Sequence, residues 1–217
     1  MDASSAPVAT VNIAAALSPL AQAAPDRIAM RCPGPDGRYA DAHTLTYAAL
    51  DARSNAIAAG LATHGIVRGT RTVLMVRPTP EFFLLMFALF KAGAVPVLVD
   101  PGIDRRALKQ CLGEAEAEAF IGIPLAQFAR VLLGWATSAR VRITTGRRAL
   151  LSDATLADVE RAGAGAGPQL AATAGDDIAA ILFTSGSTGV PKGVVYRHRH
   201  FAAQIDMLRD AFGIGAG

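Results

Sequence analysis

The sequence predicts an α/β fold in which a largely parallel sheet is covered by helices on both faces. Short apolar runs alternate with longer segments whose apolar residues recur at helical spacing, and turns with glycine or proline separate them. In addition, 52% of the 217 residues are hydrophobic, which is enough to bury both faces of a sheet. We therefore expect a layered αβα architecture.

Capping and stop residues delimit the first elements. Asn12 is a candidate helix N-cap, and Pro25 ends the apolar pattern that follows it. A Pro-Gly-Pro-Asp-Gly turn then separates two short β-type runs. The expected elements are a helix over residues 13–24, strands over residues 27–32 and 43–47, and a helix from about residue 50 to a glycine stop at 64–65.

The middle of the chain repeats a strand-helix-strand pattern. The expected elements are strands over residues 72–76, 95–99, 119–122 and 140–144, and helices over residues 81–91, 104–115 and 124–134. The wholly apolar run from Phe82 to Phe90 is about half the length that spans a bilayer, so we expect a buried helix that ends at Gly93.

A glycine-rich segment divides the chain. Residues 163–168 read Gly-Ala-Gly-Ala-Gly-Pro and lack the spacing of a dinucleotide-binding fingerprint. We interpret residues 1–162 as an N-terminal α/β subdomain and residues 163–175 as a Gly/Ala-rich linker region, in which residues 163–168 form a flexible connection. Residues 176–217 are then expected to form a strand, a loop, a second strand and a helix that runs to about Phe212.

Composition excludes several classes of protein. The net charge is +3, basic residues are scattered and only 6% of residues are aromatic, so nucleic-acid binding is not expected. Cys32 and Cys111 are far apart and lack metal-type spacing, which favours reduced thiols and the cytoplasm. The N-terminus carries Asp2 without the Lys or Arg of a signal peptide, and no segment is long enough for a membrane span.

A polar stretch directly after an apolar strand carries the clearest chemical signal. Residues 181–193 read Ile-Leu-Phe-Thr-Ser-Gly-Ser-Thr-Gly-Val-Pro-Lys-Gly. Glycines let backbone N–H groups approach an anion, hydroxyls add donors and a lysine adds a mobile charge. The pattern predicts a cradle for a nucleoside triphosphate, formed by Thr184, Ser185, Gly186, Ser187, Thr188, Gly189 and Lys192.

This loop is not the P-loop of NTPases. A P-loop has glycine before its lysine and Ser or Thr after it, whereas Pro191 precedes Lys192 here and Gly193 follows. The loop also leads into a second short β-type run, Val194 to Tyr196, rather than into a helix. The remaining alternative is a surface hairpin that binds nothing.

The order Thr-Ser-Gly-Ser-Thr-Gly-x-Pro-Lys-Gly is similar to the signature loop of the adenylate-forming superfamily, which includes acyl-CoA synthetases, fatty acyl-AMP ligases and peptide-synthetase adenylation domains. Residues 45–50 (Leu-Thr-Tyr-Ala-Ala-Leu) and 91–101 (Lys-Ala-Gly-Ala-Val-Pro-Val-Leu-Val-Asp-Pro) resemble two further motifs of that superfamily. The resemblance implies the N-terminal part of an adenylate-forming fold, the use of ATP and Mg²⁺, and Thr188 as a candidate metal ligand.

Within the superfamily, residues 81–91 and 193–201 look most like the bacterial β-lactone synthetases of long-chain olefin biosynthesis. That resemblance implies a long-chain β-hydroxy acid substrate, an acyl-adenylate, closure to a β-lactone, and assembly with other olefin-biosynthesis enzymes. Two alternatives stay open: a fatty acyl-CoA synthetase or fatty acyl-AMP ligase, and a catalytically incomplete nucleotide-binding fragment.

A cluster of basic residues follows the second strand, with the order Arg197-His198-Arg199-His200-Phe201. His198 lies where the superfamily usually has the His of a Thr-His pair, so it is the candidate catalytic residue, near the acyl or nucleotide pocket. Arg199 and His200 fit a solvated helix end equally well. Tyr196 and Phe201 are expected in the core.

The resemblance also implies residues that the sequence lacks. In the superfamily an adenine-binding aromatic motif, a magnesium-binding Glu, a ribose-binding Asp and the catalytic Lys of a mobile C-terminal domain all follow the loop, and none is found before Gly217. We therefore expect these 217 residues to be the N-terminal portion of a longer enzyme and to be inactive alone.

Overall fold

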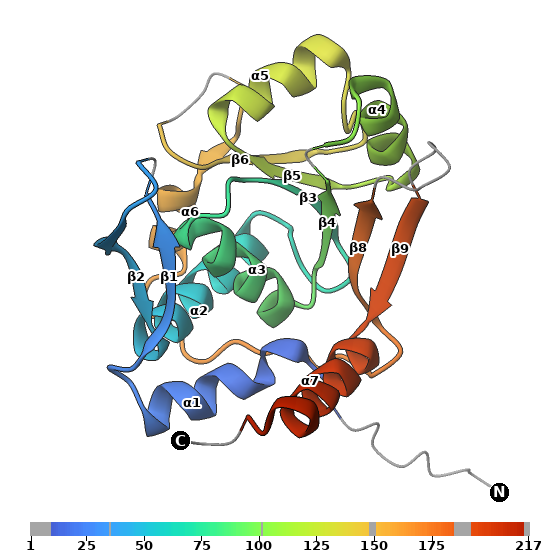
Figure 1. The fold of residues 1–217 in the computed structure, drawn as a ribbon. Coiled ribbons are helices and arrows are strands. Elements are labelled where there is room, and N and C mark those ends of the chain that lie inside the picture. The colour runs from blue at the N-terminus through green and yellow to red at the C-terminus, as the bar shows by residue number, and fades with distance from the viewer. Residues whose placement is uncertain (1–9, 35, 101, 148–150, 185–191, 215–217) are drawn as a thin grey trace, which may run out of the picture.

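Figure 1 shows a computed structural model of the chain, which describes residues 10–34, 36–100, 102–147, 151–184 and 192–214. The strands are β1 (Ile28–Pro33), β2 (Tyr39–Thr46), β3 (Arg71–Met75), β4 (Val95–Val99), β5 (Ala119–Gly122), β6 (Val141–Thr144), β7 (Ala154–Thr155), β8 (Ile178–Thr184) and β9 (Lys192–Arg197). The helices are the 3₁₀ helix η1 (Ile13–Ala16) and α1 (Leu17–Ala23), α2 (Tyr47–Thr63), α3 (Pro80–Ala92), α4 (Arg105–Glu114), α5 (Pro124–Leu133), α6 (Leu156–Ala162) and α7 (His198–Phe212).

Seven of the described strands form one sheet, in the order β7-β6-β5-β3-β4-β8-β9. Every neighbouring pair is parallel except β8 and β9, which form an antiparallel hairpin. Strands β1 and β2 pair antiparallel in a separate two-stranded sheet, as the turn between them predicts. The expected α/β fold with a largely parallel sheet is confirmed.

Helices cover both faces of the central strands β3, β4 and β5, whereas β9 at the edge of the sheet is largely exposed. Helices α2, α3 and α6 pack on one face, and α4 and α5 pack on the other (Figure 1). Successive strand residues point to opposite layers: Leu74 packs with the first group of helices, while its neighbour Val73 packs with the second. Burial on both faces explains why β4 and β5 are continuous apolar runs without polar alternation.

The order of the strands creates a point where the connections diverge. Strand β3 lies between β4 and β5 and is parallel to both. The chain therefore leaves β3 through α3 toward one side, and after β4 it crosses back over β3 through α4 on the opposite face. In open α/β sheets, ligands bind at the carboxyl edge beside such a point.

Side-chain caps set the helix ends, with small shifts from the expected bounds. Asn12 Oδ1 accepts a hydrogen bond from the backbone N–H of Ala14, as predicted, although the first turn is a 3₁₀ helix. Thr46 Oγ1 caps α2, so Tyr47 begins a helix instead of ending a strand. Gly93 has φ 68° and stops α3 where expected.

Strand β7 and helix α6 were not predicted. A capping box between Thr155 and Asp158 begins α6, which packs on α2 at two glycines. A Cβ atom on Gly60 would lie 1.9 Å from the carbonyl oxygen of Val159, and one on Gly163 would lie 1.9 Å from a carbonyl oxygen of α2. The contact between α2 and α6 therefore requires glycine at both positions.

The linker region 163–175 is bonded to several elements beyond residue 168. The backbone N–H of Gln169 donates to Asn55 Oδ1 (3.1 Å), and that of Ala171 donates to the carbonyl oxygen of Lys91 (2.7 Å). Thr173 Oγ1 donates to the carbonyl oxygen of Val11 (2.8 Å). The segment thus crosses α2 and α3 and leads into β8, which joins β4 in the same sheet. The boundaries at 162 and 175 stay a prediction.

Within the described ranges, no helix combines the length and hydrophobicity that a membrane crossing requires.

Candidate functional site

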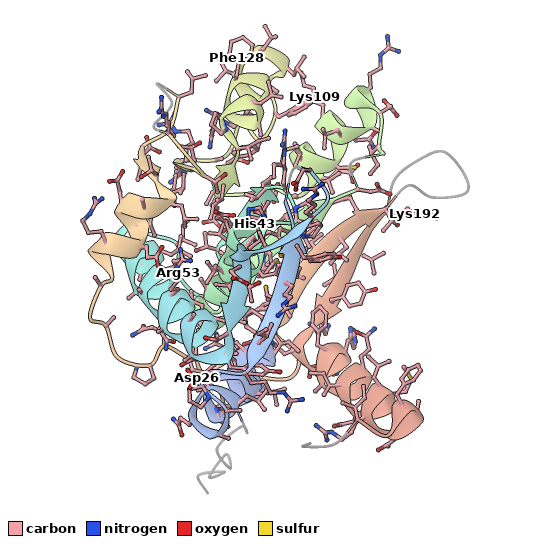
Figure 2. All side chains as sticks on the ribbon, turned by 60° about the vertical axis from the view of Figure 1, so that its left-hand side comes forward. Asp26, His43, Arg53, Lys109, Phe128 and Lys192 are labelled. Atoms are coloured by element: carbon pink, nitrogen blue, oxygen red, sulfur yellow. The ribbon has the colours of Figure 1, made fainter. Side chains whose placement is uncertain are left out.

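The predicted phosphate loop joins the two strands of the β8–β9 hairpin. Thr184 ends β8 and Lys192 begins β9, and the two residues are partners in the hairpin register. Both are exposed at the carboxyl edge of the sheet, where Figure 2 shows Lys192. The other predicted phosphate-binding residues, Ser185, Gly186, Ser187, Thr188 and Gly189, lie outside the described residues.

The base of the loop is held against the core by an aromatic ring. Phe183 is buried, and a Cβ atom on Gly193 would lie 2.9 Å from its Cε1 atom. Glycine after the lysine therefore lets β9 cross over the ring. Gly193 of the Pro-Lys-Gly sequence therefore has a structural role. The close approach of β9 to the Phe183 ring fixes the position from which Lys192 extends.

A second superfamily-like motif reaches the same edge. Asp100 follows β4, and its backbone N–H donates to the carbonyl oxygen of Phe183 (3.0 Å). Its Oδ1 atom accepts from the N–H of Gly102 (2.8 Å), which closes the turn after β4. The end of the 91–101 motif and the start of the loop are thus bonded to each other, although they are more than 80 residues apart in the sequence.

An apolar pocket of about 590 Å³ lies at the carboxyl ends of β3 and β4, where the connections that follow these two strands diverge. Its wall comes from both strand ends and from the helices that follow them, with Met75, Phe82, Val99, Ile103, Ile123 and Ala126 among the lining residues. Arg77 and Asp100 are its charged residues. Sequence reasoning did not single out these two, although both directly follow apolar strands, the position at which α/β sheets place ligand contacts.

The lysine of the 91–101 motif is structural. Lys91 is 1% exposed, and its Nζ atom donates to Asp51 Oδ1 (2.8 Å), to the Asp51 carbonyl oxygen (2.9 Å) and to Asn55 Oδ1 (2.7 Å). Burial lowers the pKa of Lys91, while the hydrogen bond that it donates to Asp51 opposes that shift. These bonds tie α3 to α2.

His198 lies at the opposite end of the hairpin from the loop. Six residues of β9 separate it from the loop, a distance of about 20 Å. The ring is buried, and its Nδ1 atom accepts from the backbone N–H of Ile13 (3.2 Å). Burial lowers the pKa of His198, which favours the neutral ring that this bond requires. The structure does not bring His198 together with Thr184 and Lys192.

The neighbours of His198 form the start of α7. Arg197 donates to the carbonyl oxygen of Asp176, and Arg199 pairs with the carboxylate of the same residue. Tyr196 and Phe201 stack with ring centroids 5.4 Å apart and are half-buried, whereas we expected them in the core.

Comparison with known proteins agrees with these motifs. Residues 18–216 match the model of the AMP-binding enzyme family. The chain is 70% identical over 209 residues to the olefin beta-lactone synthetase of Xanthomonas campestris and 68% identical over 210 residues to that of Stenotrophomonas maltophilia. Each match covers 95% of this chain and 38% of the relative.

The fold is also that of solved adenylate-forming enzymes. A long-chain-fatty-acid-CoA ligase from Archaeoglobus fulgidus superposes with a TM-score of 0.80 at 20% identity, covering 97% of this chain and 41% of the other. The family match covers well over half of the chain, and the loop, the fold and the sequence identities agree with it. The chain therefore belongs to the AMP-binding enzyme family.

Proposed function

We propose that the protein containing this chain activates a long-chain β-hydroxy acid with ATP and closes the resulting acyl-adenylate to a β-lactone, with release of AMP. The observation that carries this proposal is the 70% identity to an olefin beta-lactone synthetase over 95% of the chain. Because the chain spans 38% of that relative, the complete reaction also needs residues outside it.

The first step would form the adenylate at the carboxyl edge of the sheet. A carboxylate oxygen attacks the α-phosphorus of ATP, the bond to the β-phosphate oxygen breaks, and pyrophosphate leaves. Negative charge grows on the leaving group, so fixed donors aimed at it lower the barrier. We assign that role to the ammonium group of Lys192 and to the N–H and hydroxyl groups of residues 184–189.

The donor set suits Mg²⁺. This ion is usually held by substrate phosphates, water and only one or two protein oxygens, and it neutralises phosphate charge when bound. The described part of the chain contains no cluster of three His, Cys, Asp or Glu side chains that could hold a metal by itself. Thr188 is the candidate protein ligand, and its hydroxyl is a hard oxygen donor of the required type.

The second step needs no external acceptor. The β-hydroxyl oxygen attacks the acyl carbon, the bond to the AMP oxygen breaks, and the hydroxyl proton is released. An internal nucleophile held beside the acyl carbon has a large effective-molarity advantage over a free thiol. We further propose that the enzyme works in the cytoplasm with other olefin-biosynthesis enzymes, which suits the two buried, unpaired thiols of Cys32 and Cys111.

Lys192 provides the first test. In the intact protein, Lys192→Ala should lower ATP–pyrophosphate exchange with a long-chain β-hydroxy acid by at least ~10-fold, which is about 1.4 kcal/mol of transition-state stabilisation. Arg38→Ala removes an exposed cation from the β1–β2 turn and should leave the exchange rate unchanged. Equal rates in the two variants would show that Lys192 does not act on the phosphates.

A further inference from the structure

Helix α5 lies in the outer layer of the molecule (Figure 1), and several of its large apolar side chains are exposed. Four large side chains of this ten-residue helix are more than half exposed: Leu125 (68%), Phe128 (57%), Val131 (53%) and Leu132 (69%). Figure 2 shows Phe128 at the outer surface, with Lys109 on the neighbouring helix. We call these four residues the α5 ridge.

The other side of α5 already holds the helix in place. Ala126 and Gln127 are buried, and Gln127 Nε2 donates to the carbonyl oxygen of Ile143 (2.9 Å). The guanidinium carbon of Arg130 lies 5.8 Å from the centroid of the Phe120 ring. An amphipathic helix needs one apolar stripe to pack on its domain, so the α5 ridge is apolar surface in excess of what packing among the described residues uses.

The stretch of chain that contains α5 carries charge of one sign in its sequence. The sequence from Ala119 to Ser152 contains five arginines and no aspartate or glutamate, and Arg130 is the one charged residue of α5. The ammonium group of Lys109, on α4, lies 3.4 Å from the Cβ position of Gly134 at the end of α5.

Acidic residues border this stretch in the sequence, with Glu114, Glu116 and Glu118 before it and Asp153 after it. Asp153 pairs with Arg142 (2.7 Å), and at the two ends of α4 Asp104 caps the helix while Glu114 accepts from Gln110. An apolar ridge with basic flanks complements an anionic surface.

We propose that α5 docks the protein on the surface of an anionic phospholipid bilayer. The α5 ridge would enter the boundary between headgroups and acyl chains, and Lys109, beside the end of α5, would lie near the lipid phosphates. Ten helical residues are about 15 Å long, so the helix would lie in the plane of the surface. A second copy of the chain fits less well, because a symmetric contact would bring two positively charged surfaces together.

The position of the α5 ridge relates membrane docking to the apolar pocket. Ile123, just before α5, and Ala126 line the apolar pocket at the carboxyl edge of the sheet, while Leu125 and Phe128 face outward. The helix would therefore separate a lipid surface from the apolar pocket at the carboxyl edge of the sheet. If the proposed function holds, this arrangement suits a long-chain acid that partitions into membranes. Docking itself does not depend on that function.

The test is co-sedimentation of the intact protein with vesicles of phosphatidylcholine and phosphatidylglycerol, compared with vesicles of phosphatidylcholine alone. We expect binding to the anionic vesicles that weakens in 0.5 M salt, and at least about 10-fold weaker binding of the double variant Phe128→Ser, Leu132→Ser. The control variant Tyr39→Ser, Leu170→Ser removes two exposed apolar side chains elsewhere and should bind like the parent.

Three results would overturn the proposal. These are unchanged vesicle binding of the ridge variant, equal binding to neutral vesicles, and loss of self-association in the ridge variant without any vesicle binding by the parent. The last would make the α5 ridge a protein–protein surface. Thermal melts check that each variant folds. ATP–pyrophosphate exchange with a short, water-soluble β-hydroxy acid should be equal in parent and ridge variant, so failure of docking is separable from failure of the proposed function.

Discussion

Lys91 shows how a motif residue can support the fold without touching a ligand. Its ammonium group is removed from water, and that cost is offset by three hydrogen bonds to Asp51 and Asn55. From the sequence, this lysine is a basic residue at the end of an apolar helix, a position usually solvated. What placed it inside is the close packing of α2 on α3, which the local sequence does not encode.

Removing Lys91 should therefore cost much more than removing a surface partner. We expect Lys91→Met to lower the free energy of unfolding by about 3 kcal/mol, because it leaves the Asp51 carboxylate without its partner. The control Arg53→Met breaks the more exposed pair with Glu160 and should cost less than about 1 kcal/mol. Urea unfolding measures both. Equal losses would mean that the Lys91 bonds add no more than a surface ion pair.

His198 and Lys192 mark the limit of residue-level prediction. Both were singled out by their place in a motif, yet Lys192 is exposed at the carboxyl edge, whereas His198 is packed against η1 and α3 at the other end of the hairpin. The register of β9 separates them, and register depends on the partner strand. The motif shows that these residues are close in the sequence. It does not show at which end of the strand each of them lies.

At the scale of elements, glycines decide how closely helices approach. Gly60→Ala should destabilise the protein by about 1–3 kcal/mol, because the new methyl group would overlap the Val159 carbonyl oxygen. Gly113→Ala is the matched control: this helical glycine has no heavy atom within 4 Å of its Cβ position, so the change should stabilise by roughly 0.5–1 kcal/mol. Melting temperatures that move in the same direction would contradict this explanation of the α2–α6 contact.

The capping box of α6 predicts that the stability of the protein depends on pH in the acidic range. Hydrogen bonds from the Thr155 side chain, then from the Thr155 backbone and from Arg161, lower the pKa of Asp158 to about 2. Because the folded pKa is below the unfolded value of about 3.9, the stabilisation is complete above pH 4 and is lost as the pH falls through 2. The difference in urea midpoint between the parent and Asp158→Ala should shrink over that range. A difference that stays constant down to pH 2 would exclude the carboxylate as its source.

Most elements were predictable because each had a local signal. Apolar strands bounded by turns and helices with caps and glycine stops were found within a few residues of their observed ends, as with α3 and its stop at Gly93. Strand β7 was missed because two residues carry no periodicity, and α6 was missed although Thr155 and Asp158 have the spacing of a capping box. Residues 163–175 were expected to be a linker region, and the bond from Gln169 to Asn55 was not predicted because Gly/Ala composition does not reveal bonds to distant residues.

At the scale of the whole molecule, the parallel sheet brings distant motifs to one edge. The phosphate loop leaves β8 and the Asp100 turn leaves β4, and these strands are neighbours with carboxyl ends on the same side. The apolar pocket lies at that edge, and Ile123 and Ala126, at the start of α5, form part of its lining. The sequence predicts the class of fold and the loop, while the meeting of the motifs at one edge follows only from strand order.

The most direct test of the central claim is the product made by the intact protein. With ATP, Mg²⁺ and a long-chain β-hydroxy acid, and without coenzyme A, mass spectrometry should detect AMP and a β-lactone, because the internal hydroxyl replaces an external acceptor. The matched acid without the hydroxyl should stop at the acyl-adenylate. If product forms only when coenzyme A is added, and is the thioester, the β-lactone proposal is contradicted and the protein is an acyl-CoA ligase.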